Sequence, residues 1–374
     1  MQTSVFDHQC MAHAIRLAKL GRFTTTPNPN VGCVITKDQQ LLATGYHLRA
    51  GQGHAEVNAL AKLTAEQIKG STAYVTLEPC SHTGRTGSCA QALIDAQVSR
   101  VVCAMQDPNP QVAGRGFSML KAAGIEVQQG LMEQQALDIN KGFIKRMTQQ
   151  RPFVRIKLAM SLDGRTAMQS GESQWITGPS ARSDVQRLRA SSCAIVTGIG
   201  SILEDDSSLT VRVNELDIDA HTYDLPLIDQ RQPLRVVLDS KGRLPADAKI
   251  LQQPGRTLQV TTADSATVSA DTLLLDSSDK GIDLMALLEH LAEKEACNSV
   301  LVEAGAKVAG SFVEQGLFDE LVVYMAPTIL GSTARPLLEI DKQLMSQQQR
   351  LTLIDKRFIG DDLRLTYQAV STAV

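Results

Sequence analysis

Along the first part of the chain, short apolar runs that predict strands alternate with apolar repeats at helical spacing. The stretch from Ser4 to Leu20 places apolar side chains at helical spacing, and Gly21 is a natural stop. Further helical patterns cover His54–Leu63, Ala90–Ala96, Gly116–Ala123 and Glu133–Met147. Strand patterns cover Val31–Thr36, Leu41–Tyr46, Thr72–Leu77, Val101–Ala104 and Ile125–Gln128. The alternation predicts one layered α/β domain over residues 1–148.

The polar segment Gln149-Gln150-Arg151-Pro152 interrupts this pattern and predicts a domain boundary. A second α/β pattern follows, which predicts another domain over residues 149–374. Its expected strands are Phe153–Leu158, Ala194–Thr197, Leu234–Leu238, Thr257–Val260, Ser299–Glu303 and Leu321–Met325. Its expected helices are Ser180–Ala190, Leu284–Glu295 and Val308–Gln315. The stretch from Asn214 to Gln232 has mixed polarity and is interpreted as a surface loop or hairpin.

Composition and charge narrow the class of protein. The 374 residues are 43% hydrophobic and 21% charged, which is enough to bury sizeable cores. The net charge of −3 argues against a partner that is a nucleic acid or an acidic membrane. No apolar run approaches the roughly 18 to 20 residues that span a bilayer, and the first residues do not resemble a secretory signal. Seven cysteines fit reduced thiols in a cytoplasmic protein better than a disulfide scaffold.

Three short segments of the first domain carry the residue types of a catalytic zinc site. They are His54-Ala55-Glu56, Pro79-Cys80 and Cys89. One His and two Cys supply three ligands and leave the fourth tetrahedral position open for water. A Glu two residues after the His can point at that water and move a proton to a leaving amine. This combination is typical of zinc nucleobase deaminases, although the eight residues Ser81–Ser88 separate the two cysteines here.

The alternative is a purely structural zinc site. Such a site normally has four protein ligands, and His82 is the available substitute for the missing one. A structural site would give Glu56 no role, so the joint pattern favours catalysis.

Longer runs around these residues resemble a known family. The runs from Thr76 to Thr86 and from Gln106 to Gly116 resemble the deaminase half of the bifunctional riboflavin-biosynthesis deaminase/reductase. Segments that resemble its reductase half are Lys157–Ala167, Gly171–Thr177, Leu203–Asp206 together with Leu209–Arg212, and Val302–Ala306. The resemblance implies a cytidine-deaminase-like zinc domain followed by a domain similar to dihydrofolate reductase. That family typically has two prolines before the second Cys, whereas this chain has Gly87-Ser88, which should loosen the loop.

The resemblance implies two consecutive reactions on one small phosphoribosylaminopyrimidine. The first is a zinc-dependent hydrolytic deamination of the diaminopyrimidinone, with Glu56 as the catalytic residue. The second is reduction of the ribosyl group of the resulting aminouracil to ribityl, with NADPH as the hydride donor. Neither reaction needs a nucleic acid or a membrane, and both are compatible with a homo-oligomer.

The resemblance also assigns site residues by position. NADPH contacts fall on Ala159, Trp175, Ser201, Asp205, Ser240, Gly305, Ala306, Lys307, Val308, Ala309, Gly310 and Ser311. Substrate contacts fall on Ser173, Arg189, Leu209, Arg212 and Glu303. Small residues after a strand let backbone N–H groups approach a phosphate at a helix N-terminus, but a tight turn explains them as well. Trp175, the only Trp, fits either a stacking surface or a loop anchor.

Several other polar residues are candidates for substrate binding or proton transfer, and the sequence alone leaves more than one role open for them. Asn28 and Asn30 are candidates to bind ribose or base, or they serve turn chemistry alone. His82, Arg85 and Arg115 are candidates to hold the substrate phosphate. The sugar must open to an imine before it accepts a hydride, so the second site needs a proton donor. The candidates are Lys157, Asp163 and Glu303, with Lys157 and Glu303 preferred.

Three other functions compete with the bifunctional enzyme. One is a deaminase whose second half is an inactive, reductase-like scaffold. Another is a nucleic-acid base deaminase, which the acidic charge and the lack of a basic, aromatic stripe disfavour. The last is a zinc-stabilised binding module without catalysis, in which Glu56 would have no function.

Overall fold

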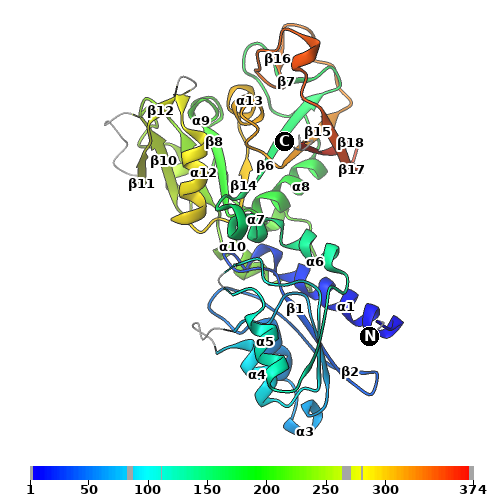
Figure 1. The fold of residues 1–374 in the computed structure, drawn as a ribbon. Helices are drawn as coiled ribbons and strands as arrows, with labels where there is room; N and C mark the ends of the chain where they lie inside the picture. The colour runs from blue at the N-terminus through cyan, green and yellow to red at the C-terminus, as the bar shows by residue number, and fades with distance from the viewer. Residues whose placement is uncertain (1–2, 82–86, 111, 263–270, 279–280, 370–374) are drawn as a thin grey trace. The chain divides into compact units, whose positions relative to one another are not determined.

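The computed structural model describes residues 3–81, 87–110, 112–262, 271–278 and 281–369. The chain divides into two compact units, Met1–Arg151 and Pro152–Val374 (Figure 1). The last helix of the first unit, α7, spans Lys141–Gln149 and ends where Gln150 takes a left-handed backbone conformation. The boundary expected after residue 148 therefore falls inside α7, and the first strand of the second unit begins at Phe153.

The first unit is built on a five-stranded sheet in the order β2-β1-β3-β4-β5. The strands are β1 Gly32–Lys37, β2 Gln40–Tyr46, β3 Thr72–Val75, β4 Arg100–Cys103 and β5 Glu126–Gln129. Strand β1 runs antiparallel to both neighbours, whereas β3, β4 and β5 are parallel. The helices before α7 are α1 Val5–Ala18, η1 Lys19–Phe23, α2 Ala55–Leu60, α3 Ala65–Ile68, α4 Cys89–Asp95, α5 Arg115–Ala122 and α6 Glu133–Ile139.

Two glycines on adjacent strands bring helices onto opposite faces of this sheet. A Cβ on Gly32 would meet the carbonyl oxygen of Ala14 in α1. A Cβ on Gly45 would meet the carbonyl oxygen of Ala55 in α2. The register pairs Gly45 with Cys33, so Gly32 and Gly45 point to opposite faces. Helices α1 and α2 thus enclose the sheet between them, and α2 brings the predicted zinc ligand His54 with it.

The second unit contains a nine-stranded sheet in the order β11-β10-β9-β8-β14-β6-β15-β18-β17. Its strands are β6 Phe153–Ser161, β8 Ala194–Gly198, β9 Leu234–Leu238, β10 Thr257–Thr261, β11 Asp271–Leu274, β14 Ser299–Val302, β15 Glu320–Ala326, β17 Leu351–Ile359 and β18 Asp362–Ala369. The strands from β11 to β15 are parallel, and β18 and β17 add an antiparallel edge. Two-residue or three-residue strands form two further pairs, β12 Ser277–Ser278 with β13 Gly281–Ile282 and β7 Arg165–Ala167 with β16 Arg335–Pro336.

Helices cover both faces of this sheet. On one face Ala194 and Val196 of β8 pack in a core with α12 (Leu284–Glu293) and α13 (Ala306–Glu314). On the other face Ile195 packs with α8 (Pro179–Ala190) and α9 (Ile199–Asp205). The remaining helical segments are η2 Val213–Glu215, α10 Leu225–Gln230, α11 Lys249–Gln252 and η3 Met345–Gln347. Both units are α/β, which confirms the predicted fold class.

The structure corrects two sequence expectations. The stretch interpreted as a loop or hairpin, Asn214–Gln232, contains α10, whose N-cap Asp224 accepts a hydrogen bond from the backbone N–H of Leu227. The hairpin of β17 and β18 was not expected, because most of the β17 side chains are exposed and give no buried run. Among the described residues, no helix is both long and apolar enough to cross a membrane.

Candidate active sites

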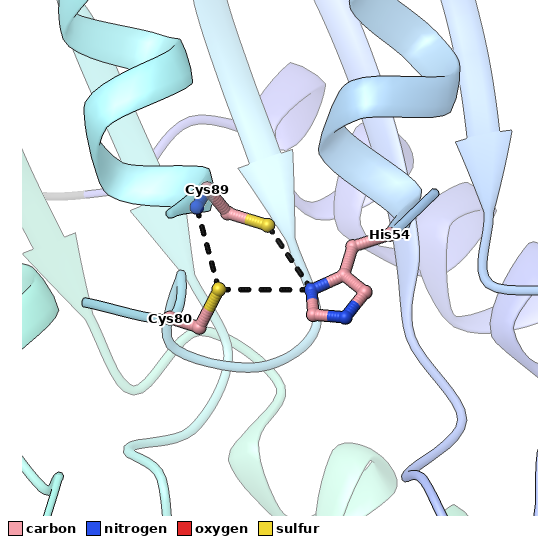
Figure 2. Close-up of side chains that lie close together, drawn as sticks. All are labelled: His54, Cys80 and Cys89. Atoms are coloured by element: carbon pink, nitrogen blue, oxygen red, sulfur yellow. Dashed lines mark hydrogen bonds between the residues drawn. The ribbon is translucent and has the colours of Figure 1, made fainter. Parts of the chain in front are cut away.

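His54, Cys80 and Cys89 point toward one another in the first unit (Figure 2). His54 is the N-cap of α2, and Cys89 is the first residue of α4. The three ligand atoms lie within 4.8 Å of one another. His54 Nδ1 is 3.2 Å from Cys89 Sγ and 3.6 Å from Cys80 Sγ. Three segments that are distant in the sequence therefore meet at one point.

The donor set of this cluster fits zinc. Two thiolates and one imidazole are typical ligands of zinc, and three protein ligands leave one tetrahedral position open. The pKa of Cys80 lies below its ordinary value, because the Cys89 thiol and then His54 hydrogen-bond to the Cys80 thiolate. The backbone N–H of Cys89 also donates to Cys80 Sγ at 3.3 Å. These contacts favour the thiolate form of Cys80, which is the form that binds a metal.

Ser88 fastens the two cysteine segments to each other. Its hydroxyl donates to the carbonyl oxygen of Cys80 at 2.8 Å and accepts the backbone N–H of Gln91 at 3.2 Å, as the N-cap of α4. The pair Gly87-Ser88, expected to loosen this loop, therefore includes a residue that ties Cys80 to α4. The candidates His82 and Arg85 lie outside the described residues.

Glu56 lies in the first turn of α2 and is 3% exposed. Burial raises its pKa to about 7. Its carboxylate also takes part in a hydrogen bond with the thiol of Cys89. A carboxyl group beside the ligand cluster, with a pKa near neutrality, can both accept and release a proton.

The two candidate asparagines of the first unit have different surroundings. Asn28 donates from Nδ2 to Nε2 of His47 at 3.0 Å, and the His47 ring meets the His54 ring edge-on with centroids 5.2 Å apart. The side chain of Asn30 instead donates to the carbonyl oxygen of Ile139 and accepts from the hydroxyl of Thr25. Asn28 therefore lies beside the ligand cluster, whereas Asn30 anchors its loop.

A cavity of about 810 Å³ opens in the second unit, at the carboxyl ends of β8, β9 and β14 and beside residues 157–159 of β6. The carboxyl edge of a parallel sheet is a common place for such a site. The predicted site residues that line it are Lys157, Ala159, Ser173, Trp175, Arg189, Ser201, Asp205, Leu209, Arg212, Ser240, Glu303, Gly305, Ala306, Lys307, Val308 and Ser311. Ala309 and Gly310 do not line it. Ala309 is buried in the core, and a Cβ on Gly310 would meet the carbonyl oxygen of Glu339.

Glu303 is the centre of a charged cluster at one end of the cavity. Arg189 donates to both of its carboxylate oxygens, at 2.6 and 3.0 Å, and Lys157 Nζ lies 3.8 Å away. Burial opposes the charge of Glu303, but the positive charges of Arg189 and Lys157 keep its pKa below the ordinary value. Burial lowers the pKa of Lys157, while the charge of Glu303 acts against that shift. These surroundings favour Lys157 over Glu303 as the candidate proton donor.

Asp163, the third candidate donor, serves the turn around it. Its carboxylate accepts hydrogen bonds from the Ser161 hydroxyl and from the backbone N–H groups of Leu330 and Gly331. These bonds, the one from Ser161 first, lower the pKa of Asp163 to about 2. Asp163 is not among the residues that line the cavity.

Two other cavity residues have partners that the sequence pattern does not reveal. The guanidinium of Arg212 donates to both oxygens of Glu215, at 2.5 and 2.7 Å. The ring of Trp175 is 68% exposed, and the guanidinium of Arg182 lies 4.6 Å from its centroid. Trp175 thus presents a flat aromatic surface at the cavity wall.

Comparison with known proteins places both sites in one family. Residues 4–105 match the model of the cytidine and deoxycytidylate deaminase zinc-binding region, and residues 152–365 match that of the RibD C-terminal domain. The chain is 50% identical to the riboflavin biosynthesis protein RibD of Escherichia coli (strain K12), over 96% of this chain and 98% of that protein. The chain belongs to the RibD family.

Solved structures agree with this assignment. The Acinetobacter baumannii RibD is 46% identical and superposes with a TM-score of 0.90, over 98% of this chain and 99% of that one. A Thermotoga maritima protein is 30% identical with a TM-score of 0.86 at the same coverage. It is described as a diaminohydroxyphosphoribosylaminopyrimidine deaminase/5-amino-6-(5-phosphoribosylamino)uracil reductase. The RibD resemblance found in short motifs therefore extends over nearly the whole chain.

Sequence reasoning missed two buried residues that shape the RibD deaminase site. His47 is 2% exposed. Its Nε2 accepts the hydrogen bond from the Asn28 amide, and its Nδ1 lies 3.1 Å from the carbonyl oxygen of Gly53. Glu78, 4% exposed, stands just before Pro79-Cys80 in the motif. Its carboxylate accepts backbone N–H groups from Asp107, Gly114, Gly116 and Phe117.

Glu78 therefore holds the loop that leads to α5 against the segment that carries Cys80. Arg115, the described candidate for the substrate phosphate, is the exposed first residue of α5 directly after this loop. The only sequence signal for Glu78 was its place next to the Pro-Cys pair.

Proposed function

We propose that this RibD protein catalyses two consecutive steps of riboflavin biosynthesis. It deaminates a diaminohydroxyphosphoribosylaminopyrimidine and then reduces 5-amino-6-(5-phosphoribosylamino)uracil, the activities named for the Thermotoga maritima relative. The observation that supports this most is the presence in one chain of a His-Cys-Cys cluster beside a buried Glu and a separate cavity around a Lys-Glu-Arg cluster.

In the first step, water replaces the amino group of the ring and ammonia leaves. Zinc held by His54, Cys80 and Cys89 supplies, when bound, a water of lowered pKa and a positive charge for the developing anion. Glu56 takes a proton from the attacking water and delivers it to the departing amine. Burial suits Glu56 to both tasks, because a pKa near 7 lets the same carboxyl group act as base and then as acid.

Asn28 is proposed to bind the substrate ring beside the cluster. Its Nδ2 is engaged by His47, so the amide is held in one orientation and its oxygen is left to face a ring N–H. A fixed amide positions the reacting carbon near the ligand cluster and lowers the entropic cost of reaching the transition state.

In the second step, the ribosyl C1′ accepts a hydride and the sugar becomes ribityl. NADPH, when bound, supplies that hydride. Lys157 supplies the proton that opens the sugar ring, and Glu303 fixes the position of the ammonium group from 3.8 Å. Arg189 fixes Glu303 in turn, because two of its hydrogen bonds reach the two oxygens of that carboxylate while a third, to the Thr210 carbonyl oxygen, anchors the guanidinium.

The remaining predicted contact residues are proposed to bind the substrate. Arg212 is proposed to exchange Glu215 for the substrate phosphate, since its guanidinium fork already fits a pair of anionic oxygens. Ser173 and Leu209 line the same cavity and complete the substrate pocket. The reactions need only small molecules, and seven cysteines that form no disulfide suit the reducing cytoplasm.

The variant Glu56→Gln tests the deaminase assignment. It should lower ammonia release by about a hundredfold or more while zinc content, measured by atomic absorption, stays near one per chain. The matched control is Glu66→Gln, which changes an exposed Glu at the next helix and should keep full activity. Full ammonia release by Glu56→Gln would refute the proton-transfer role.

A further inference from the structure

The charged side chains of the second cavity differ between its two ends. Near β6 and β14 the cations Lys157 and Arg189 both face Glu303. Near the end of β9 the cavity is lined by Arg243 and Lys249. Arg243 Nε is 3.9 Å from Asp239 Oδ1, and within the described part of the chain the Lys249 ammonium group has no ion-pair partner. The β9 end therefore offers two cations with no ion pair closer than 3.9 Å in the described residues, and the Asp206 carboxylate beside them accepts the Lys249 backbone N–H at 2.9 Å.

The strand order gives a direction to a dinucleotide in this cavity. The strands lie in the order β9-β8-β14-β6, and their carboxyl ends share one edge of the sheet. The proposed function puts the nicotinamide beside Lys157 of β6. The N-terminus of α13, after β14, suits the pyrophosphate. The adenosine must then extend past Ser201 of α9, which follows β8, toward the loop that follows β9.

The loop after β9 has a fixed shape. The backbone N–H of Gly242 donates to the carbonyl oxygen of Asp239 at 3.1 Å, and Gly242 takes a φ of 63° that favours glycine. The buried carboxylate of Asp239 accepts the backbone N–H of Leu244 at 2.8 Å and the Gln259 side-chain amide at 2.9 Å. These bonds close a turn that presents Ser240 and Arg243 to the cavity.

The Arg243 side chain stays available within this fixed turn. It is 54% exposed, and Asp239 Oδ1, the oxygen that it faces, has no hydrogen-bond partner in the described residues. The guanidinium can therefore bind an anion in the cavity without giving up a close ion pair. A guanidinium is also the side chain best suited to the planar, two-point recognition of a phosphate.

We propose that Arg243, with the hydroxyl of Ser240 beside it, binds the 2′-phosphate of NADPH and so makes the reductase prefer NADPH to NADH. This inference rests on the proposed reductase function and names the residue that sets its cofactor preference. It explains why a cation whose ion-pair partner is as far as 3.9 Å lines the cavity at the end of β9, separated by two strands from β6 and its Lys157.

The test compares adenosine 2′,5′-bisphosphate with adenosine 5′-monophosphate, which differ only in the 2′-phosphate. Binding of each to the full chain is measured by isothermal titration calorimetry. Arg243→Gln should weaken binding of the bisphosphate about ten- to a hundredfold and leave that of the monophosphate unchanged. Arg243→Lys, which keeps the charge, should retain part of the preference. The matched control is Lys241→Gln, two residues away on the same turn and outside the cavity, which should bind both as the unmodified chain does.

Two results would overturn the proposal. One is an Arg243→Gln variant that still prefers the bisphosphate as strongly as the unmodified chain. The other is loss of the preference in Lys249→Gln or Lys307→Gln but not in Arg243→Gln. If the unmodified chain bound neither nucleotide and no NADPH, the reductase function itself would fail, and this inference with it. That outcome is distinguishable because it appears before any substitution is made.

Discussion

Asp7 shows how one buried residue supports the first unit. It is 4% exposed, accepts the Tyr74 hydroxyl at 2.7 Å, and accepts Arg100 Nη1 at 2.8 Å. Burial opposes its charge, yet the bonds from Arg100, Ser4 and Tyr74 hold the pKa of Asp7 well below its usual range. This carboxylate joins α1 to β3 and β4, the strands behind the ligand cluster.

Asp7→Asn should lower the free energy of unfolding of the first unit by about 3–5 kcal/mol at pH 7, because it leaves Arg100 without its buried partner. A depressed carboxyl pKa contributes stability above the unfolded value of about 4, and this contribution is lost as the pH falls below that value. Hydrogen exchange of the α1 amides should therefore separate the two proteins at pH 7, and the difference should begin to narrow as the pH falls toward 3. A difference that stays the same at both pH values would contradict the assignment.

Glu303→Gln tests the link between Glu303 and the proposed proton donor. The charge of Glu303 supports the protonated form of Lys157, so its removal should lower the pKa of Lys157 further. The reductase needs Lys157 protonated, and its kcat/KM should therefore begin to fall at a lower pH in the variant. Ammonia release by the same variant serves as the control and should keep its pH profile. An unshifted reductase profile would count against Lys157 as the donor.

The residues that could be predicted from the sequence are those with short, local patterns. His54 and Glu56 stand two apart at a helix start, and Cys80 follows a Pro, so the chemistry is visible without the fold. His47 and Glu78 act through partners that only folding brings near, such as Asn28 and the backbone of the loop before α5. No pattern in one sequence marks a carboxylate whose partners are backbone N–H groups.

At the scale of elements, the close approach of α5 to the Cys80 segment controls the ligand cluster. A Cβ on Gly116 would meet the carbonyl oxygen of Pro79 and approach Glu78 Oε1 to 3.2 Å. Gly116 is thus required by packing, since no side chain fits between α5 and the carbonyl group of Pro79.

Gly116→Ala should displace Pro79-Cys80 and raise the fraction of chains without zinc after dialysis against a chelator, with ammonia release falling in proportion. Gly87→Ala is the matched control: Gly87 is only two residues from Cys89, and a Cβ there would meet no atom within 4 Å. Equal zinc loss in both variants would mean that the loop tolerates no change of any kind, and would contradict the specific role of the α5 contact.

Helices and strands could be predicted from the sequence where their buried positions form a regular apolar pattern. Strand β8 is buried on both faces and appears as a continuous apolar run. Strand β17 is mostly exposed and has no such run, and its pairing with β18 depends on a hairpin at the edge of the sheet. Helix α10 was missed because its six residues lie in a stretch of mixed polarity, where no helical repeat of apolar positions stands out.

For the whole molecule, the change of pattern at Gln149–Pro152 corresponds to the division into two units, each with its own sheet and core. The deaminase cluster draws all its residues from the first unit, and the reductase cavity draws all its residues from the second. Two separate sites explain how one chain of nearly balanced charge can act twice on one small, phosphorylated substrate.

The measurement that tests this account most directly follows ammonia and NADPH together. The unmodified protein receives the diaminohydroxyphosphoribosylaminopyrimidine with and without NADPH, and ammonia release and the loss of nicotinamide absorbance are recorded separately. We expect ammonia in both reactions and, where NADPH is present, about one NADPH oxidised for each ammonia released. Ammonia release without any oxidation of NADPH would contradict the account, because the second unit would then be a scaffold without reductase activity.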